Sequence, residues 1–177
     1  IIVVDDGSTD TTANIALSYA LMFPEIVRLI RTENHGVAAA RNLIVEQARY
    51  NHLTWLDADD FYHPEKLEAQ YSTLMIGHML NRSIPGDDYL IAFSDFSMGG
   101  SVFSFQPFLC DPVRYILNGE FRAYLWASMV ATEAYRRVGA FNVRLHRSED
   151  TDWLLRYLLS APRRILSTGA APLMTYH

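Results

Sequence analysis

Three aspartates end a short apolar stretch in the middle of the chain. Residues 53–56 predict a short buried strand, and Asp57, Asp59 and Asp60 follow it directly. If the strand geometry persists, Asp57 and Asp59 project to the same side, because side chains alternate along a strand. Two carboxylates held so close repel unless a cation, a proton or a donor network lies between them. The stretch therefore fits a divalent metal that also binds water and a substrate diphosphate, or else an acidic loop whose last aspartate begins the next helix.

A second pair of acids, Asp5 and Asp6, directly follows the apolar run 1–4. In a parallel α/β sheet, ligands bind beyond the carboxyl ends of the strands, which is where both groups of acids fall. One carboxylate can accept the imide N–H of a pyrimidine, or a ribose hydroxyl, while another holds a metal. Alternatively, Asp5 and Asp6 only make the side-chain hydrogen bonds of a tight turn.

Further charged residues lie near the starts of predicted helices. Arg41 can pair with a strand-end carboxylate or with a phosphate, or it can lie on a solvated helix face. Glu149 and Asp150 fall in the first turn of a later helix. One of these carboxylates can act as a general base toward an acceptor hydroxyl. Acids at this place also stabilise the helix dipole, and spacing alone favours that simpler interpretation.

The first half of the chain alternates between predicted strands and helices, which calls for a parallel sheet with right-handed crossovers. The predicted strands are 1–4, 26–30 and 53–56, and the predicted helices are 11–23, 37–50 and 64–80. In the first helix, Ile15, Tyr19 and Met22 are expected on one face.

The second half has a mixed α+β pattern. Segments 89–96 and 102–108 flank Gly99-Gly100 and predict a hairpin. The other predicted elements are helices at 111–119, 132–139 and 149–160 and strands at 125–130, 165–166 and 173–176, with Thr132 and Ser148 as helix caps. Trp153 lies on an apolar helix face and is expected in the core.

Length and composition favour one globular domain, since the chain has 177 residues, of which 50% are hydrophobic and 20% charged. The net charge of -5 argues against nucleic acid as a partner, and the single cysteine excludes an internal disulfide. There is neither a signal peptide nor an apolar run of membrane-spanning length, so we expect a cytoplasmic or membrane-peripheral chain. It begins on a predicted strand without Met, and we expect an N-terminally incomplete domain.

Several short motifs follow one another along the chain. They are Ile-Val-Val-Asp-Asp-Gly-Ser-Thr-Asp at 2–10, Asn-His-Gly at 34–36, Ala-Arg-Asn at 40–42, Leu-Asp-Ala-Asp-Asp at 56–60 with Pro64, Val-Gly-Ala-Phe at 138–141, and Ser-Glu-Asp-Thr-Asp-Trp-Leu at 148–154 with Arg156. In this order they resemble family 2 glycosyltransferases over about residues 1–157.

The resemblance implies a GT-A fold: a Rossmann-like nucleotide-binding sheet flanked by helices, merging into a mixed α+β acceptor half. It implies inverting transfer from a nucleotide sugar, expected to be a UDP-sugar, to a glycan, lipid-linked or protein acceptor, with Mn²⁺ or Mg²⁺ as cofactor. Within a single domain 1–177, residues 1–97 would bind the donor and residues 98–177 the acceptor. On the donor side, the resemblance implies that Asp5 or Asp6 binds the uracil, that Arg41 binds the nucleotide sugar and that Asp57 contacts the ribose. It implies that Asp59, in the DxD motif, binds the metal. On the acceptor side, it implies that Asp150 is the catalytic base and that Glu149 supports the acceptor.

The sequence departs from the family pattern at a few places. An earlier strand that ends in a Pro-x-Tyr-Asn-like segment is absent. Gly139-Ala140 occurs where Gly-Gly is commoner, and Ser148 where Gly is commoner. The last two differences concern acceptor detail rather than the class of reaction.

Other protein classes fit the sequence less well. A receiver-type signalling domain needs a lysine after a later strand, but Lys66, the only lysine, directly follows the third strand. A nucleotidyltransferase would normally show a Gly-rich loop with a basic residue near the nucleotide, which this sequence lacks. A catalytically silent nucleotide-sugar-binding domain stays as the main alternative to an active glycosyltransferase.

Overall fold

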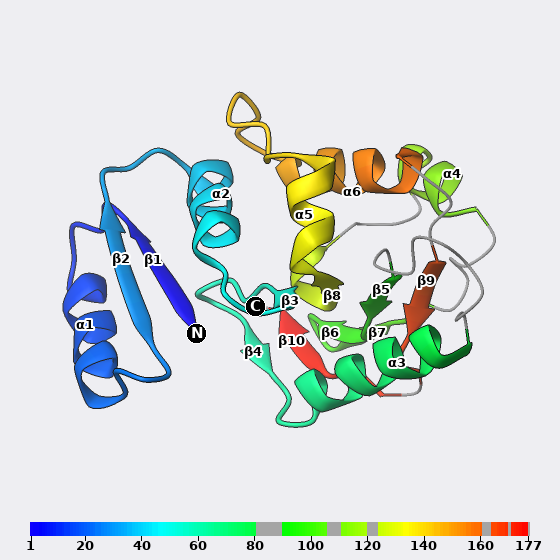
Figure 1. The fold of residues 1–177 in the computed structure, drawn as a ribbon, viewed down its shortest axis with the longest axis horizontal. Helices are drawn as coiled ribbons and strands as arrows, with labels where there is room; N and C mark the ends of the chain where they lie inside the picture. Colours follow the sequence, from blue (N-terminus) through cyan, green and yellow to red (C-terminus); the bar gives the residue numbers. More distant parts are fainter. Residues whose placement is uncertain (81–89, 106–110, 120–123, 161–163, 170, 177) are drawn as a thin grey trace.

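Three β-sheets and their connecting helices make up the described part of the chain, which in this computed structural model is residues 1–80, 90–105, 111–119, 124–160, 164–169 and 171–176. Figure 1 shows a small strand–helix–strand unit on one side and a larger layered body on the other. Within the described ranges, no helix is long and apolar enough to cross a membrane. Cys110 and His177 lie outside them.

The small unit contains β1 (Ile2–Asp6), α1 (Thr12–Met22) and β2 (Arg28–Thr32), and its two strands pair in parallel as expected. The expected apolar face of α1 does not pack, however. Ile15, Tyr19 and Met22 are 56%, 52% and 60% exposed. A two-stranded sheet offers too little area to cover a whole helix face.

The third strand, β3 (His52–Thr54), does not extend this parallel pair, which corrects the expected run of three parallel strands. It pairs in antiparallel orientation with β8 (Ser128–Ala131), with Leu53 opposite Val130. Both side chains are buried in the main core. The preference of β3 for this distant apolar partner, rather than for β1, joins the two halves of the sequence in one sheet.

The central sheet has the order β3-β8-β5-β9 and is covered on both faces (Figure 1). Its strand β5 (Leu90–Phe93) pairs in parallel with β9 (Arg164–Ser167). Alternate residues of β5 serve different layers: Leu90 and Ala92 pack with Leu74 of α3 (Lys66–Leu80), whereas Ile91 and Phe93 belong to the main core. This alternation explains why β5 is apolar at every position.

Helix α3 lies unusually close to the sheet at Gly77. A Cβ at this position would come within 2.6 Å of Leu166 Cδ1 and 2.9 Å of Leu90 Cδ1. An alanine at this position would therefore require the side chains of Leu166 and Leu90 to shift in the closely packed layer.

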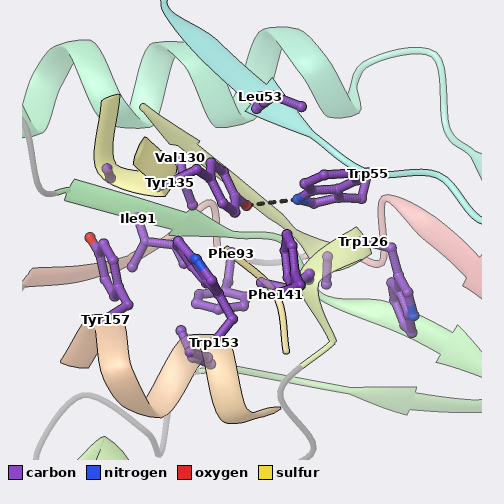
Figure 2. Close-up of a cluster of buried hydrophobic side chains, with 14 of the residues drawn as sticks. Leu53, Trp55, Ile91, Phe93, Trp126, Val130, Tyr135, Phe141, Trp153 and Tyr157 are labelled. Carbon is purple, nitrogen blue, oxygen red and sulfur yellow. Dashed lines mark hydrogen bonds between the residues drawn. The ribbon is translucent and has the colours of Figure 1, made fainter. Parts of the chain in front are cut away.

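An aromatic cluster fills the opposite face, under α2 (Val37–Gln47), α5 (Thr132–Val138) and α6 (Glu149–Leu159) (Figure 2). The ring of Tyr135 stacks on Trp153 with centroids 4.2 Å apart, and its hydroxyl accepts a hydrogen bond from Trp55 Nε1 at 2.7 Å. Trp153 is completely buried, which confirms the expectation from the helical spacing. The cluster thereby connects α5 and α6 to Trp55, two residues before Asp57.

The remaining strands form a third sheet, β4-β10-β6-β7. A hairpin joins β6 and β7 through Gly99 and Gly100, which both have positive φ (55° and 80°), so the predicted turn is confirmed. The predicted first strand, 89–96, was wrong, because its residues are divided between β5 in the central sheet and β6 in the third sheet. The four strands of this sheet are β4 (Phe61–Tyr62), β10 (Met174–Tyr176), β6 (Phe96–Met98) and β7 (Ser101–Phe103). Two short helices complete the described elements, α4 (Pro112–Leu117) and the 3-10 helix Leu125–Ala127. The predicted hairpin ends at residues 89 and 106–108 lie outside the described residues.

A buried lysine connects α3 to the central sheet. Lys66 is 0% exposed, and its Nζ donates to Gln70 Oε1 at 2.8 Å and to Thr54 Oγ1 at 3.3 Å. The amide of Gln70 in turn donates to the carbonyls of Ala92 and Ala127. Burial lowers the pKa of Lys66 to about 7, because a charged ammonium is poorly solvated there.

The Trp55–Tyr135 hydrogen bond gives a test of the aromatic cluster. We expect Tyr135→Phe to lower the free energy of unfolding by about 1–3 kcal/mol, because a buried indole N–H loses its acceptor while the packing volume is kept. Urea denaturation measures the change. Tyr50, which is 81% exposed, provides the matched control, and Tyr50→Phe should change stability by less than about 0.5 kcal/mol. Equal effects of the two substitutions would contradict the role of the hydroxyl.

Lys66 predicts an unusual dependence of stability on pH. Its pKa is near 7 in the folded chain, against an ordinary value of 10.5 for a lysine in water, so between these values the unfolded chain binds more protons. The free energy of unfolding should therefore rise with pH above 7, by up to about 1.4 kcal/mol per pH unit. This added stability should disappear as the pH falls back to 7. Urea titrations from pH 7 to 9.5 measure it. Lys66→Met should abolish the rise, and a persistent rise in that variant would contradict this account.

Candidate active site

The acids after β3 lie on a turn, residues 55–60, which we call the acid turn. Strand β3 ends at Thr54, so the expected strand alternation of Asp57 and Asp59 does not apply, and the backbone instead closes with a hydrogen bond from Asp60 N to Asp57 O at 3.1 Å. Asp57 is partly exposed, Asp59 is exposed and Asp60 is buried. The turn thus presents Asp57 and Asp59 to solvent.

Two aromatic residues hold the ends of the acid turn in place. The hydroxyl of Tyr62, in β4, donates to the carbonyl of Trp55 and lies 3.0 Å from Thr54 Oγ1. Trp55 itself is fixed through its indole N–H to Tyr135. Sequence reasoning missed Tyr62, because a two-residue strand gives no periodic signal.

Arg41 is the centre of the site. It is buried, and its guanidinium donates through Nη2 to Asp57 Oδ1 at 3.3 Å and through Nη1 to Glu149 Oε1. The guanidinium carbon lies 5.9 Å from the ring centroids of both Trp55 and Phe141. Of the two sequence interpretations, pairing with a strand-end acid is confirmed, and the solvated helix face was wrong. One cation therefore joins the acid turn to the start of α6, 108 residues along the chain from Arg41.

The start of α6 brings a second carboxylate next to Glu149. Asp150 is partly buried and accepts hydrogen bonds from Thr151 N at 2.7 Å and Thr151 Oγ1 at 3.3 Å. Burial raises the pKa of Asp150 above its usual value, against the opposing effects of these bonds and of Arg41. A carboxylate that is less acidic than usual is better suited to accept a proton from a hydroxyl.

Ser148 precedes this pair of acids in a left-handed conformation, with φ 63° and ψ 23°. It is the only non-glycine residue with positive φ in the described part of the chain. Its side chain makes no capping hydrogen bond, so the predicted cap was wrong. Thr132, the other predicted cap, lies inside α5 and donates to Tyr50 O. The backbone bend at Ser148 therefore turns the chain into α6 at a cost of roughly 1–2 kcal/mol for an L-residue.

Asp5 and Asp6 occupy the end of β1, and both carboxylates accept hydrogen bonds. Asp5 accepts from Ser8 N at 3.2 Å and Arg31 Nε at 3.1 Å, and these bonds lower its pKa. Asp6 accepts from the backbone N–H groups of His35 and Gly36, at 2.9 and 2.7 Å. The structure thus brings Asp6 to the start of α2, the helix of Arg41, whereas these bonds hold Asp5 within the β1–β2 unit.

Three stacked aromatic rings also lie beside the acid turn. Tyr176 stacks on Trp126 with centroids 5.4 Å apart, and Tyr124 stacks on the other rings. Burial and the neighbouring acid turn together raise the pKa of Tyr176. A pocket of about 170 Å³ lies elsewhere, between α2 and residues 139–141, and its lining includes none of the predicted site residues.

A metal ion fits the acid turn only if a ligand helps to hold it. Among the described residues, no group of three or more histidine, cysteine or acidic side chains is placed to bind a metal alone. Asp57 is already paired with Arg41, and the exposed Asp59 accepts no hydrogen bond from the described part of the chain. Mg²⁺-type sites often have one or two carboxylates, with water and phosphate oxygens completing the shell, and this donor set matches that pattern.

Comparisons with known proteins agree with this geometry. The profile of glycosyl transferase family 2 matches residues 1–78. An uncharacterised glycosyltransferase of Rickettsia felis is 28% identical over 92% of this chain, which spans 27% of that relative. S. aureus TarS has a TM-score of 0.75 at 19% identity, covering 98% of this chain and 30% of TarS.

A glucosyl-3-phosphoglycerate synthase of Mycobacterium tuberculosis also matches in fold, with a TM-score of 0.52 at 17% identity, covering 96% of this chain and 58% of the synthase. The expected α/β fold of the GT-A type is therefore confirmed. The sequence profile over residues 1–78 and the glycosyltransferase relatives make this chain similar to glycosyl transferase family 2.

Proposed function

We propose that this chain is the core of a metal-dependent, inverting glycosyltransferase that transfers a sugar from a UDP-sugar to an acceptor hydroxyl in glycan synthesis. Residues 1–97 would bind the donor and residues 98–177 the acceptor. The observation that carries the proposal is the position of Arg41 between Asp57 and Glu149. A buried cation that joins a strand-end acid to the first turn of α6 is difficult to explain as a surface feature, because buried ion pairs are costly to desolvate.

The nature of the donor is supported by the solved relatives. TarS has been solved with UDP and with UDP-GlcNAc, and the mycobacterial synthase with Mn²⁺ and UDP-glucose. For this chain we assign the ribose contact to Asp57, which Arg41 holds in place, and nucleotide binding to Asp6 or Asp5. Asp6 suits this role through its bonds to the turn before α2, whereas Asp5 has its carboxylate fully enclosed.

Asp59 is the residue we assign to the metal. Its carboxylate is exposed, on a turn whose ends are fixed by Trp55 and Tyr62. When bound, a divalent metal would neutralise negative charge on the departing nucleoside diphosphate. The chain's contribution is to hold Asp59 at a defined place, since a metal ligand must be positioned before the ion arrives.

Asp150 is the proposed general base. Its raised pKa and its place beside Glu149 suit a group that removes the proton of the acceptor hydroxyl as that oxygen attacks the anomeric carbon. Glu149 is held by Arg41 and is therefore assigned to shaping the acceptor site rather than to proton transfer. Attack from the face opposite the leaving nucleotide would invert the configuration.

The metal assignment predicts how donor binding responds to a carboxylate deletion. UDP with Mn²⁺ should stabilise the chain against heat, by about 2.7 kcal/mol at a ligand concentration 100 times the dissociation constant. Asp59→Asn should remove most of this stabilisation, and chelation should do the same in the unchanged chain. Glu68→Gln removes a nearby exposed acid of α3 as the matched control and should leave the shift intact. Stabilisation by UDP that is independent of metal would contradict the role of Asp59.

The base assignment is tested by Asp150→Asn. The amide cannot accept a proton, so we expect sugar transfer to fall by about 10² to 10⁴-fold while UDP affinity stays unchanged. Asp152→Asn removes another acid from the same helix turn and therefore controls for the effect of the helix dipole. It should lower the free energy of unfolding by less than about 1 kcal/mol and leave sugar transfer intact. In the unchanged enzyme, transfer should fall with decreasing pH at a value above the usual aspartate pKa. Near-normal sugar transfer by Asp150→Asn would contradict the role of Asp150 as the base and would show that this residue has only a structural role.

A further inference from the structure

Residues 142–148 form an exposed arm that leaves the protein beside the proposed base and returns to it. In Figure 1 this arm is the gold loop that projects beyond α5 and α6. A turn orders its tip, with Leu145 N donating to Asn142 O at 3.0 Å and Arg144 N to Asn142 Oδ1 at 3.1 Å. All of its residues except Leu145 are exposed.

Consecutive residues of α2 hold the two ends of the arm. At one end, the Asn42 amide donates to Phe141 O at 3.0 Å and accepts from Phe141 N at 2.7 Å. At the other end, Arg41 pairs with Glu149. The arm is therefore anchored to the same helix turn that holds the acid turn.

Arg156 fixes the approach to the arm from α6. Its guanidinium donates to Val138 O at 3.0 Å and to Ala140 O at 2.9 Å. Because the chain just before the arm is held from two helices, the position of the arm relative to Asp150 is well defined. Arg147 lies three residues before Asp150, so their Cα atoms are at most about 11 Å apart.

The arm carries arginines whose side chains have no partner in the described part of the chain. It contains Arg144, His146 and Arg147 and no acid. Of the arginines whose side chains the structure describes, only Arg49, Arg144 and Arg147 make neither a side-chain hydrogen bond nor an ion pair. In a chain with a net charge of -5, two of these three free guanidinium groups thus lie beside the proposed base.

From this arrangement we propose that the arm is an acceptor-binding element that recognises negatively charged groups, phosphate or carboxylate, through Arg144 and Arg147. A guanidinium group binds both anions through charge-assisted hydrogen bonds, and the anchored ends keep both groups within reach of an acceptor whose hydroxyl lies at Asp150. The inference rests on the proposed function, because it identifies the chemical class of the acceptor for that site.

The test measures binding of anionic probes to the full chain without donor. The probes are a short glycerol-phosphate oligomer, trigalacturonate and neutral maltotriose, titrated by calorimetry at low salt. We expect at least one anionic probe to bind about tenfold or more tightly than maltotriose, and to weaken as salt is added. Preference for the phosphate or for the carboxylate probe identifies which anion the acceptor carries.

Variants of the arm locate the binding. We expect the double variant Arg144→Gln, Arg147→Gln to bind the anionic probe about tenfold more weakly. A loss of this size is what two exposed ion pairs contribute when each is near the upper end of its usual strength. Arg49→Gln is the matched control, since Arg49 is also exposed and unpaired among the described residues but follows the far end of α2. Equal binding of anionic and neutral probes, or an equal loss in Arg49→Gln, would overturn the proposal.

UDP binding with Mn²⁺, measured on the same variants, separates the two proposals. The arm variants should bind UDP normally, because Arg144 and Arg147 have no part in the donor site. If the chain fails to bind UDP but still selects anionic probes through the arm, the proposed function fails while the anion site stands. Loss of UDP affinity in the arm variants would place the arm at the donor instead and overturn the acceptor assignment.

Discussion

The site depends on one buried guanidinium between two carboxylates. Arg41 has little contact with water, so its charge is stabilised by Asp57, Glu149 and the faces of two aromatic rings. Removing one member of such a group typically costs several kcal/mol, because the remaining charges stay buried and uncompensated. The acid turn, α2 and the start of α6 therefore keep a common geometry, and elements that are far apart in sequence act as one unit.

The neighbouring layers support this unit with neutral contacts. Trp55 links the acid turn to Tyr135, and Tyr135 stacks on Trp153 of α6, so the aromatic cluster fixes the same elements that Arg41 joins by charge (Figure 2). Below the sheet, Lys66 donates to the hydroxyl of Thr54, and Gln70 donates to the carbonyls of Ala92 in β5 and of Ala127 in the 3-10 helix. Thr54, which ends β3, and Trp55, which follows it, are thus held by hydrogen bonds from opposite sides of the sheet, and the acid turn begins at this fixed point.

Local patterns predicted local structure well, whereas contacts between distant segments could not be read from the sequence. Helices α2 and α6 and the Gly99-Gly100 hairpin follow from apolar spacing and turn residues. The antiparallel pairing of β3 with β8 could not be predicted, because an apolar strand is compatible with either orientation. The choice of Asp57 and Glu149 as partners of Arg41 likewise depends on packing. Serine by itself does not indicate positive φ, so the left-handed backbone at Ser148 could be suspected only from the preference of the family for Gly at this position.

The anchoring of the arm by adjacent residues of α2 has an evolutionary consequence. Its ends are fixed by Asn42 and Arg41, so its length can change without moving the acids on either side. Closing a longer loop costs little, about 0.6 kcal/mol for each doubling of length. Under the proposed function, insertions between Phe141 and Ser148 would alter which molecules reach Asp150 while leaving the acids in place, so that small genetic steps at the arm could change the range of acceptors.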